Sequence, residues 1–358
     1  MKIVDIRTKV VSFKRRKVFK IAFGAGSDLS HRVYTQVITD SGLVGLGEAA
    51  PAPRVTGETV NGVITAVDYM KPALIGMDAA NIAEIHQVMD KQLLANPAAK
   101  ASIDIACYDI LGKKEGLPVH TLLGAETDTL ETDITIGIDT VETMVNEAVE
   151  RVGEGFRVLK IKCGISPEHD VDVLGRIRAA VGDDIDLRID INQGYDFETA
   201  IDVLNRIKVL KISEAEQPVP AWDVHTMAAI KKVSPIPIMA DESVHTPEQA
   251  RIVCEHDACD IINIKLMKCG GIYPALQISE IAKKYHKPCI VGCMSESRLG
   301  IAAAAAVVVA KDNIESADLD SFYAFTNPEI GVCGGFEVIK DRITLSPKSG
   351  FGFDEYSF

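Results

Sequence analysis

The sequence contains no hydrophobic run of the length that spans a membrane. Its most apolar stretch, residues 299–310, covers twelve residues, whereas a transmembrane helix needs ~20. Charged side chains interrupt the first fourteen positions, so these also lack the apolar core of a secretory signal peptide. We therefore expect a cytoplasmic protein that has no membrane partner.

Basic residues are too few to balance the acidic ones. The 358 residues include 38 Lys and Arg against 51 Asp and Glu, which gives a formal net charge of −13. This surplus of negative charge argues against nucleic acid and against anionic lipid as partners. The eight cysteines include no Cys-x-x-Cys pair, which favours reduced, structural thiols. No strand pattern leads into Gly-x-Gly-x-x-Gly, so we expect no dinucleotide site.

A regular repeat is present from residue 132 onward. Short β-branched runs alternate with stretches of helical periodicity. One residue near the end of each run recurs every 24 to 29 positions: Thr135, Lys162, Asp190, Glu216, Asp241, Lys265, Met294 and Asp320. Such a step predicts repeated strand–helix units that close into a parallel barrel of eight strands. A doubly wound open sheet is the alternative, but it would not explain why the unusual residues share one phase of the repeat.

The last repeat leaves no room for an eighth barrel helix before a Gly-rich tail. The predicted fold is therefore α/β: a (β/α)7β modified TIM barrel over residues 126–321. Residues 1–125 predict an α+β capping domain, with strands at 1–13, 32–39 and 43–48 and helices at 62–75, 82–94 and 98–115. The tail, residues 322–358, has strand patterns at 336–339 and 342–345 and is expected to return to the capping domain.

Three carboxylates, Asp190, Glu216 and Asp241, end three successive predicted strands. The carboxyl ends of barrel strands share one face, so these side chains can converge on one pocket. Their oxygen atoms suit a hard divalent cation such as Mg²⁺, and without a cation the three charges would repel. Each acid alone is better explained as a solvated or salt-bridged strand end. Three in register favour one Mg²⁺ per subunit.

Lysines flank these acids in the repeat. Lys160 and Lys162 alternate along one strand, so both point into the barrel if either does. Buried lysines need acidic partners or a chemical role, and a role as counter-ion explains Lys160 in part. Lys162 and Lys265 on opposite sides of a metal predict two proton-transfer groups, acting on the carbon α to a metal-held carboxylate. The metal and Lys160 would stabilise the enediolate, and proton return from the other lysine would invert the carbon.

The order of these motifs resembles a known family. They are Lys160-Ile161-Lys162, DINQG at 190–194, EQP at 216–218, ADES at 240–243 and NIK at 263–265, with GLGE at 45–48 and residues 106–124 in the first domain. Together they resemble the muconate-lactonizing subgroup of the enolase superfamily over essentially the whole chain. Asp318-Leu319-Asp320 resembles the Asp-x-Asp of the dipeptide epimerases in that subgroup. The resemblance implies a lysine base working with Mg²⁺.

The resemblance also implies a role for each site residue. Lys162 would act on the R centre and Lys265 on the S centre, with Lys160 near the substrate carboxylate. Asp318 and Asp320 would hold the α-ammonium of the N-terminal residue of a dipeptide. Two further positions are implied to line the pocket: Thr135 and Cys293.

One position departs from the Ala-Glu epimerases of this family. These carry an Arg on a loop of the capping domain, where it grips the glutamate side chain, and Gly24 aligns with that Arg. Without a guanidinium an acidic side chain loses its partner, and the neighbouring Phe23 and Ile21 favour apolar contact. We therefore expect an isomerase, a Mg²⁺-dependent dipeptide epimerase acting on the C-terminal residue of L,L or L,D dipeptides, hydrophobic rather than Ala-Glu.

Other functions remain open on the same residues. N-acylamino-acid racemases, o-succinylbenzoate synthases and muconate-type cycloisomerases use the same two lysines, but an acylated amino acid has no ammonium for Asp318 and Asp320 to bind. A non-catalytic metal-binding scaffold is a third alternative. A homo-oligomer is expected only by analogy with relatives of this type.

Overall fold

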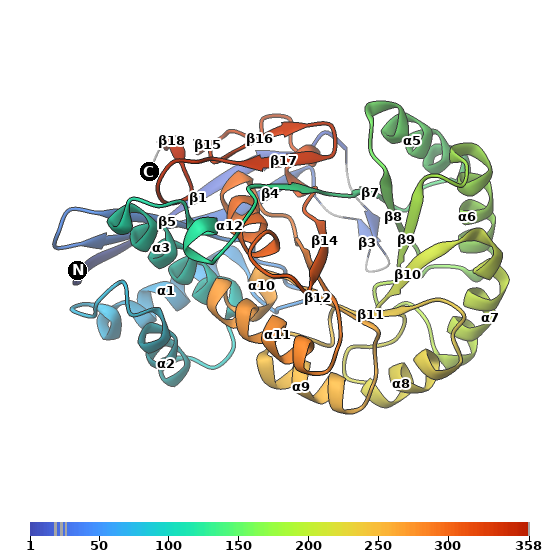
Figure 1. Ribbon diagram of the computed structural model, residues 1–358, viewed down its shortest axis with the longest axis horizontal. Helices are drawn as coiled ribbons and strands as arrows, with labels where there is room; N and C mark the ends of the chain where they lie inside the picture. The colour runs from blue at the N-terminus through green and yellow to red at the C-terminus, as the bar shows by residue number, and fades with distance from the viewer. Residues whose placement is uncertain (18–19, 22–23, 26, 357–358) are drawn as a thin grey trace.

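The computed structural model describes residues 1–17, 20–21, 24–25 and 27–356. Its largest element is a parallel sheet in the order β14-β13-β12-β11-β10-β9-β8-β7 (Figure 1). The strands are β7 (Ile134–Ile136), β8 (Val158–Lys162), β9 (Asp186–Asp190), β10 (Ile212–Glu216), β11 (Ile238–Ala240), β12 (Ile261–Ile264), β13 (Cys289–Gly292) and β14 (Ile314–Asp318). Thr132, just before β7, forms a parallel bridge with Ala317 in β14. This bridge closes the sheet, and the predicted barrel is confirmed.

Seven helices connect the eight strands. They are α5 (Val141–Glu154), α6 (Pro167–Val181), α7 (Phe197–Ile207), α8 (Val224–Val233), α9 (Pro247–Glu255), α11 (Ile272–Lys284) and α12 (Arg298–Val308), with the short α10 (Leu266–Cys269) before α11. Only a 3₁₀ turn, η2 (Ser321–Ala324), follows β14. Since residues 129–324 are all described, the (β/α)7β topology is confirmed.

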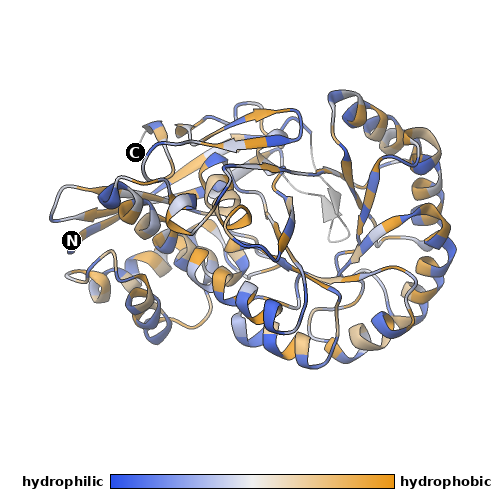
Figure 2. Ribbon diagram, in the orientation of Figure 1, coloured by the Kyte–Doolittle hydropathy of each residue, from blue (hydrophilic) through white to orange (hydrophobic). Residues whose placement is uncertain are grey.

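Helix α7 illustrates why these stretches are helical. The Asp196 side chain accepts the Thr199 N–H, which caps the first turn. Ala200, Val203, Leu204 and Ile207 are buried at helical spacing. In Figure 2 the barrel helices carry both hydrophobic and hydrophilic residues, as expected for helices with one face on the strands and one in solvent. The apolar spacing of the sequence predicts a helix over 197–210. Residues 208–210 instead form a 3₁₀ turn, and Lys211 has φ of 52°.

The N-terminal module is an antiparallel sheet packed on helices. The sheet contains β1 (Ile3–Lys14), β4 (Leu29–Thr39) and β5 (Val44–Ala49), and a short hairpin, β2 (Lys20–Ile21) and β3 (Gly24–Ala25), lies between β1 and β4. The helices are α1 (Val60–Leu74), α2 (Ile82–Gln92), α3 (Pro97–Glu115) and α4 (Val119–Leu122). Strand β5 lies directly on α3, since a Cβ atom at Gly47 would be 1.8 Å from the Ser102 carbonyl oxygen. This close approach explains the glycine.

The C-terminal tail contacts both the N-terminal module and the barrel. Its strands are β15 (Val332–Gly334), β16 (Phe336–Ile339), β17 (Arg342–Leu345) and β18 (Phe353–Tyr356), and β17 pairs with β6 (Thr129–Glu131). The Phe351 N–H donates to Asp109 of α3, while Arg298 of α12 donates to the Gly334 carbonyl. The domain boundaries at residues 125 and 321 stay predictions. Among the described helices, none combines the length and the apolar character needed to cross a bilayer.

Candidate active site

The two predicted proton-transfer lysines lie on opposite sides of the barrel. Lys162 ends β8 and Lys265 directly follows β12. These strands are four positions apart in a closed sheet of eight, so their ends face each other across the barrel axis. The ends of β9, β10 and β11 fill one arc between them with Asp190, Glu216 and Asp241. The ends of β13, β14 and β7 fill the other arc with Cys293, Asp318, Asp320 and Thr135.

Lys160 lies at the centre of this arrangement. Its Nζ is 3.1 Å from Asp190 Oδ2, 2.5 Å from Glu216 Oε2 and 2.7 Å from Asp318 Oδ2. Burial lowers the pKa of Lys160, but the negative charges of the surrounding acids, led by Asp190, outweigh burial and raise that pKa well above its usual value. Lys160 is therefore a permanent ammonium that bridges the two arcs.

Lys162 and Lys265 pair with different carboxylates. Lys162 Nζ is 2.5 Å from Asp190 Oδ2 and 3.2 Å from Asn192 Oδ1, whereas Lys265 Nζ is 2.9 Å from Asp241 Oδ2. Burial lowers the pKa of Lys265, but Asp241 raises it by more, so the group is protonated in this arrangement. Both lysines are buried, and both line the pocket.

The three acids differ in how fully their charge is compensated. Burial raises the pKa of Asp190, but the charges of Lys160 and Lys162 lower it by more, so that the resulting pKa is about 2. Burial and the charge of Asp190 raise the pKa of Glu216 to about 8. Its Oε2 atom is 2.5 Å from Lys160 Nζ, and its Oε1 atom accepts a hydrogen bond from Asn263 Nδ2 at 2.7 Å. A buried carboxylate whose pKa is raised by a neighbouring carboxylate, between two further buried carboxylates, fits a hard divalent cation.

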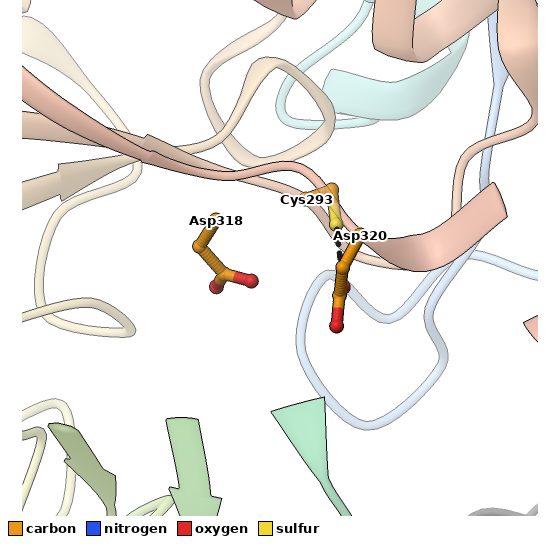
Figure 3. A group of neighbouring side chains, drawn as sticks. All are labelled: Cys293, Asp318 and Asp320. Atoms are coloured by element: carbon orange, nitrogen blue, oxygen red, sulfur yellow. Dashed lines mark hydrogen bonds between the residues drawn. The ribbon is translucent and has the colours of Figure 1, made fainter. Parts of the chain in front are cut away.

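A second acidic group lies on the opposite arc. Cys293, Asp318 and Asp320 present ligand atoms within 4.8 Å of one another, and no other group of three His, Cys, Asp or Glu residues does so in the part of the chain that the structure describes (Figure 3). Asp190, Glu216 and Asp241 do not form such a group, and each of them has a lysine ammonium against its carboxylate.

Asp320 is held by its neighbours on β7 and β13. The Thr135 N–H donates to Asp320 Oδ2 at 2.6 Å, and Cys293 Sγ lies 3.8 Å from Asp320 Oδ1. Burial and the charge of Asp318 raise the pKa of Asp320. Strand β14 ends at Asp318, so Asp320, the last residue of the sequence repeat, lies just before η2 and not on a strand. Its side chain still points into the same space.

Lys268 is a functional candidate that the sequence interpretation missed. This fully buried ammonium donates to Asp241 Oδ1 at 2.5 Å, to the Asp241 carbonyl, and to the Asn263 carbonyl at 3.1 Å. Lys265 and Lys268 are three residues apart around the one-turn helix α10, so both can reach Asp241. The three-residue spacing between Lys265 and Lys268 was the available signal.

The predicted contact at Gly24 is only partly covered by the structure. Gly24 lies in β3, and its backbone pairs with that of Ile21. Phe23, which was expected to make apolar contact with substrate, lies outside the described residues. The role of this hairpin in binding therefore stays a prediction.

Comparison with protein families now identifies the chain. A family model described as "Mandelate racemase / muconate lactonizing enzyme, N-terminal domain" matches residues 4–124, and one described as "Enolase C-terminal domain-like" matches residues 143–355. The chain belongs to the mandelate racemase and muconate lactonizing enzyme family. The resemblance to the enolase superfamily seen in the motifs is thereby confirmed.

Curated relatives align with this chain over nearly its whole length. It is 39% identical over 354 residues to the hydrophobic dipeptide epimerase of Enterococcus faecalis, with 98% of this chain and 99% of that protein covered. It is also 39% identical over 357 residues to the L-Ala-D/L-Glu epimerase of Clostridium acetobutylicum, with 99% of each covered. The crystal structure of the Enterococcus faecalis dipeptide epimerase complexed with Mg and L-Leu-L-Tyr matches with a TM-score of 0.96 at 38% identity, covering 99% of this chain and 100% of that one.

Proposed function

We propose that this family member is a Mg²⁺-dependent dipeptide epimerase, an isomerase that inverts the α-carbon of the C-terminal residue of an L,L or L,D dipeptide. The observation that supports it most is that Lys162 and Lys265 face each other across the barrel, each paired with its own carboxylate. Amines on two faces of one carbon can remove a proton from one face and return one to the other. The activities of the two relatives described above support the same class of reaction.

Asp190, Glu216 and Asp241 would hold the Mg²⁺. The burial of the three carboxylates at neighbouring strand ends and the all-oxygen donor set support this assignment. When bound, the ion supplies positive charge next to the substrate carboxylate, which makes the neighbouring α-proton more acidic. The relative crystallised with Mg and a dipeptide supports the same pairing of cofactor and substrate class.

The lysines would carry out the proton transfer. Lys162 would act on the R centre and Lys265 on the S centre, and at the start of each turnover the acting lysine must be neutral and the other protonated. Lys160, held as an ammonium by its acidic neighbours, would stabilise the negative charge that develops on the substrate carboxylate.

Asp318 and Asp320, with Thr135 and Cys293 beside them, would bind the α-ammonium of the N-terminal residue. The two carboxylates have oxygen atoms within 4.8 Å of each other, so both can bind one cation. An N-acylated substrate has no ammonium group for them to bind. Ile134, Ile138, Met294 and Tyr323 line the same pocket. Together with Gly24 in place of an Arg, these side chains support a hydrophobic C-terminal residue.

The setting of the enzyme is part of the same proposal. All eight cysteines are free thiols, which supports a cytoplasmic, reducing compartment. A homo-oligomer is proposed by analogy with relatives only.

Hydrogen exchange tests the function directly. The protein is incubated with Mg²⁺ and pools of L,L dipeptides in D₂O, and mass spectrometry follows the incorporation of one deuterium at the C-terminal α-carbon. We expect exchange in free dipeptides, loss of exchange with EDTA, and much slower exchange in N-acetylated dipeptides. Exchange confined to N-acylated amino acids would favour an N-acylamino-acid racemase instead, and no exchange in any compound would favour the metal-binding scaffold.

A further inference from the structure

The outer part of the active-site pocket is cationic, although the chain as a whole is acidic. Among the described residues that line this pocket, seven are basic and three are acidic. Three of the basic residues are the active-site lysines, which already contact carboxylates. The remaining lining charges lie nearer the mouth: Arg15, Arg16, Lys17 and Arg151, with Glu147 as their acidic counterpart.

Lys17 and Arg151 are neutralised by acids of this chain. Lys17 Nζ is 3.2 Å from Glu147 Oε2 and 3.3 Å from Asp139 Oδ2. Arg151 lies 2.8 Å from Glu154 Oε2 and 3.6 Å from Glu147 Oε1. These two cations therefore have no need of an anionic ligand.

Arg15 and Arg16 differ, because no carboxylate of the described residues lies within ion-pair distance of either. Arg15 Nη2 donates to the hydroxyls of Ser30 and Ser295, each at 2.9 Å, and its guanidinium carbon is 5.7 Å from the centre of the Phe325 ring. Nη1 and Nε of Arg15 make no hydrogen bond to the described residues. Arg16 is exposed, and its Nε donates only to the Phe325 carbonyl at 3.0 Å.

The environment of Arg15 is unusual for an unpaired cation. Burial, and after it the charge of Arg32, lower the pKa of Arg15 to about 10. The two serine hydroxyls and the Phe325 ring orient the Arg15 guanidinium. The nearby Arg32 is also positive, so none of these neighbours compensates the charge of Arg15. An anion delivered by a ligand would supply the missing partner.

The loop after β13 sets the distance between Arg15 and the acidic group. Cys293 lies beside Asp320, and Ser295, two residues further on, accepts the hydrogen bond from Arg15. Two residues of chain span at most about 7 Å. A dipeptide whose α-ammonium lies between Asp318 and Asp320 would therefore have the side chain of its N-terminal residue within reach of Arg15.

We propose that Arg15, assisted by Arg16, binds the carboxylate of an acidic side chain on the N-terminal residue, so that dipeptides beginning with Glu or Asp are the preferred substrates. The inference rests on the proposed function and deepens it. A planar guanidinium with two free donor positions suits a carboxylate. An acidic N-terminal residue is compatible with a hydrophobic C-terminal one. The absence of an Arg at Gly24 bears only on the C-terminal side chain, which is the one proposed to be hydrophobic.

The test compares substrates that differ in one charge. Initial rates of deuterium incorporation give kcat/KM for L-Glu-L-Leu and for its neutral isostere L-Gln-L-Leu. We expect a preference for L-Glu-L-Leu of at least ~10-fold, the size of one charge-assisted hydrogen bond in a half-buried site. L-Leu-L-Glu, which carries the acid on the other residue, should show no such advantage over L-Leu-L-Gln.

Two variants assign the preference to these residues. In Arg15→Gln the ratio of kcat/KM for L-Glu-L-Leu to that for L-Gln-L-Leu should fall to ~3 or less, mainly because KM for L-Glu-L-Leu rises. The rate with L-Gln-L-Leu shows whether the variant is folded. Arg16→Gln, at an exposed position that tolerates substitution, should reduce the preference partly. Arg7→Gln is the matched control, since Arg7 lies on β1, the strand that Arg15 follows, but is exposed and paired with Asp5, and it should keep the wild-type preference.

The outcomes separate this inference from the function beneath it. Equal use of L-Glu-L-Leu and L-Gln-L-Leu by the wild type, or a preference that survives in both Arg variants, would overturn the role of Arg15 and leave dipeptide epimerisation intact. Failure of every free dipeptide to exchange would overturn both.

Discussion

Among single residues, the mutual dependence of buried charges governs this site. Lys160, Lys162, Lys265 and Lys268 are all buried, and each contacts at least one carboxylate. Removing one partner of such a pair leaves the other charge buried and uncompensated, at a cost of several kcal/mol. Substituting one of these lysines therefore changes the position and the charge balance of the carboxylate that it contacts.

Lys268→Met should weaken Mg²⁺ binding by ~10-fold or more, because Asp241 would lose the ammonium that orients its side chain. Isothermal titration of the metal-free protein with Mg²⁺ measures this without a substrate. Lys283→Met is the control, since Lys283 is exposed and pairs with Asp312 at the surface. An unchanged Mg²⁺ affinity in Lys268→Met would show that Asp241 does not need this support.

Asp320→Asn should lower kcat/KM for free dipeptides by ~10-fold or more, since it removes a charge from the site proposed for the α-ammonium. N-acetylated dipeptides lack that ammonium, so their slow exchange should change by less than ~3-fold. Deuterium incorporation into both substrate types measures the difference. An equal loss for both would mean that Asp320 supports the fold of the pocket and does not bind the ammonium.

Among the elements, the segment from β13 to α12 is held by two buried carboxylates from different parts of the chain. Glu48 of β5 accepts the Ser297 and Gly300 N–H groups, both at 2.8 Å, and so caps α12. Glu296 accepts the Met294 and Ser295 N–H groups at 2.6 and 2.8 Å. It is buried and fixes the shape of its own loop.

Glu296→Gln should change how stability depends on pH. Burial and the charge of Glu48 raise the pKa of Glu296 to about 7. The unfolded state releases this proton at lower pH, so the wild type loses stability as pH rises from about 4.5 to about 7. Glutamine can accept the same two hydrogen bonds without this penalty. The variant should match the wild type near pH 4.5 and be more stable at pH 8 by about 1–3 kcal/mol.

Urea denaturation at both pH values measures this difference. Glu315→Gln, at an exposed position of β14, controls for the loss of one carboxylate anywhere in the fold. A Glu296→Gln variant whose advantage is the same at pH 4.5 and pH 8 would contradict the raised pKa of Glu296.

The elements also show what sequence can and cannot predict. Strand positions followed from a repeat in which β-branched runs and polar ends recur, because each barrel unit must bury the same pattern. Where a strand stops depends on tertiary hydrogen bonds, so the end of β14 before Asp320 was not foreseen. The cap on α12 comes from Glu48, nearly 250 residues away in sequence, and no local pattern signals it. Lys268 was missed although its spacing from Lys265 was visible, because its partner Asp241 comes from another part of the chain.

For the whole molecule, barrel closure turns scattered residues into one site. The bridge between Thr132 and Ala317 joins the two edge strands, so residues as distant as Thr135 and Asp320 come within hydrogen-bonding distance. The N-terminal module then completes the mouth with residues such as Arg15. The sequence repeat predicted the closed barrel and its lysines and acids. The contribution of Arg15 was not predicted, because it depends on how the first module lies against the barrel.

The stereochemistry of exchange in lysine variants tests the central claim most directly. Lys162→Ala and Lys265→Ala are each incubated in D₂O with Mg²⁺ and with the separate L,L and L,D epimers of one dipeptide, and deuterium incorporation and epimer ratio are followed. We expect Lys162→Ala to exchange the α-proton of the L,L epimer only and Lys265→Ala that of the L,D epimer only, with neither variant interconverting the two. The retained exchange shows that each variant is folded. Interconversion at the wild-type rate by either variant, or loss of the same epimer's exchange in both, would contradict a mechanism in which the two lysines work from opposite faces.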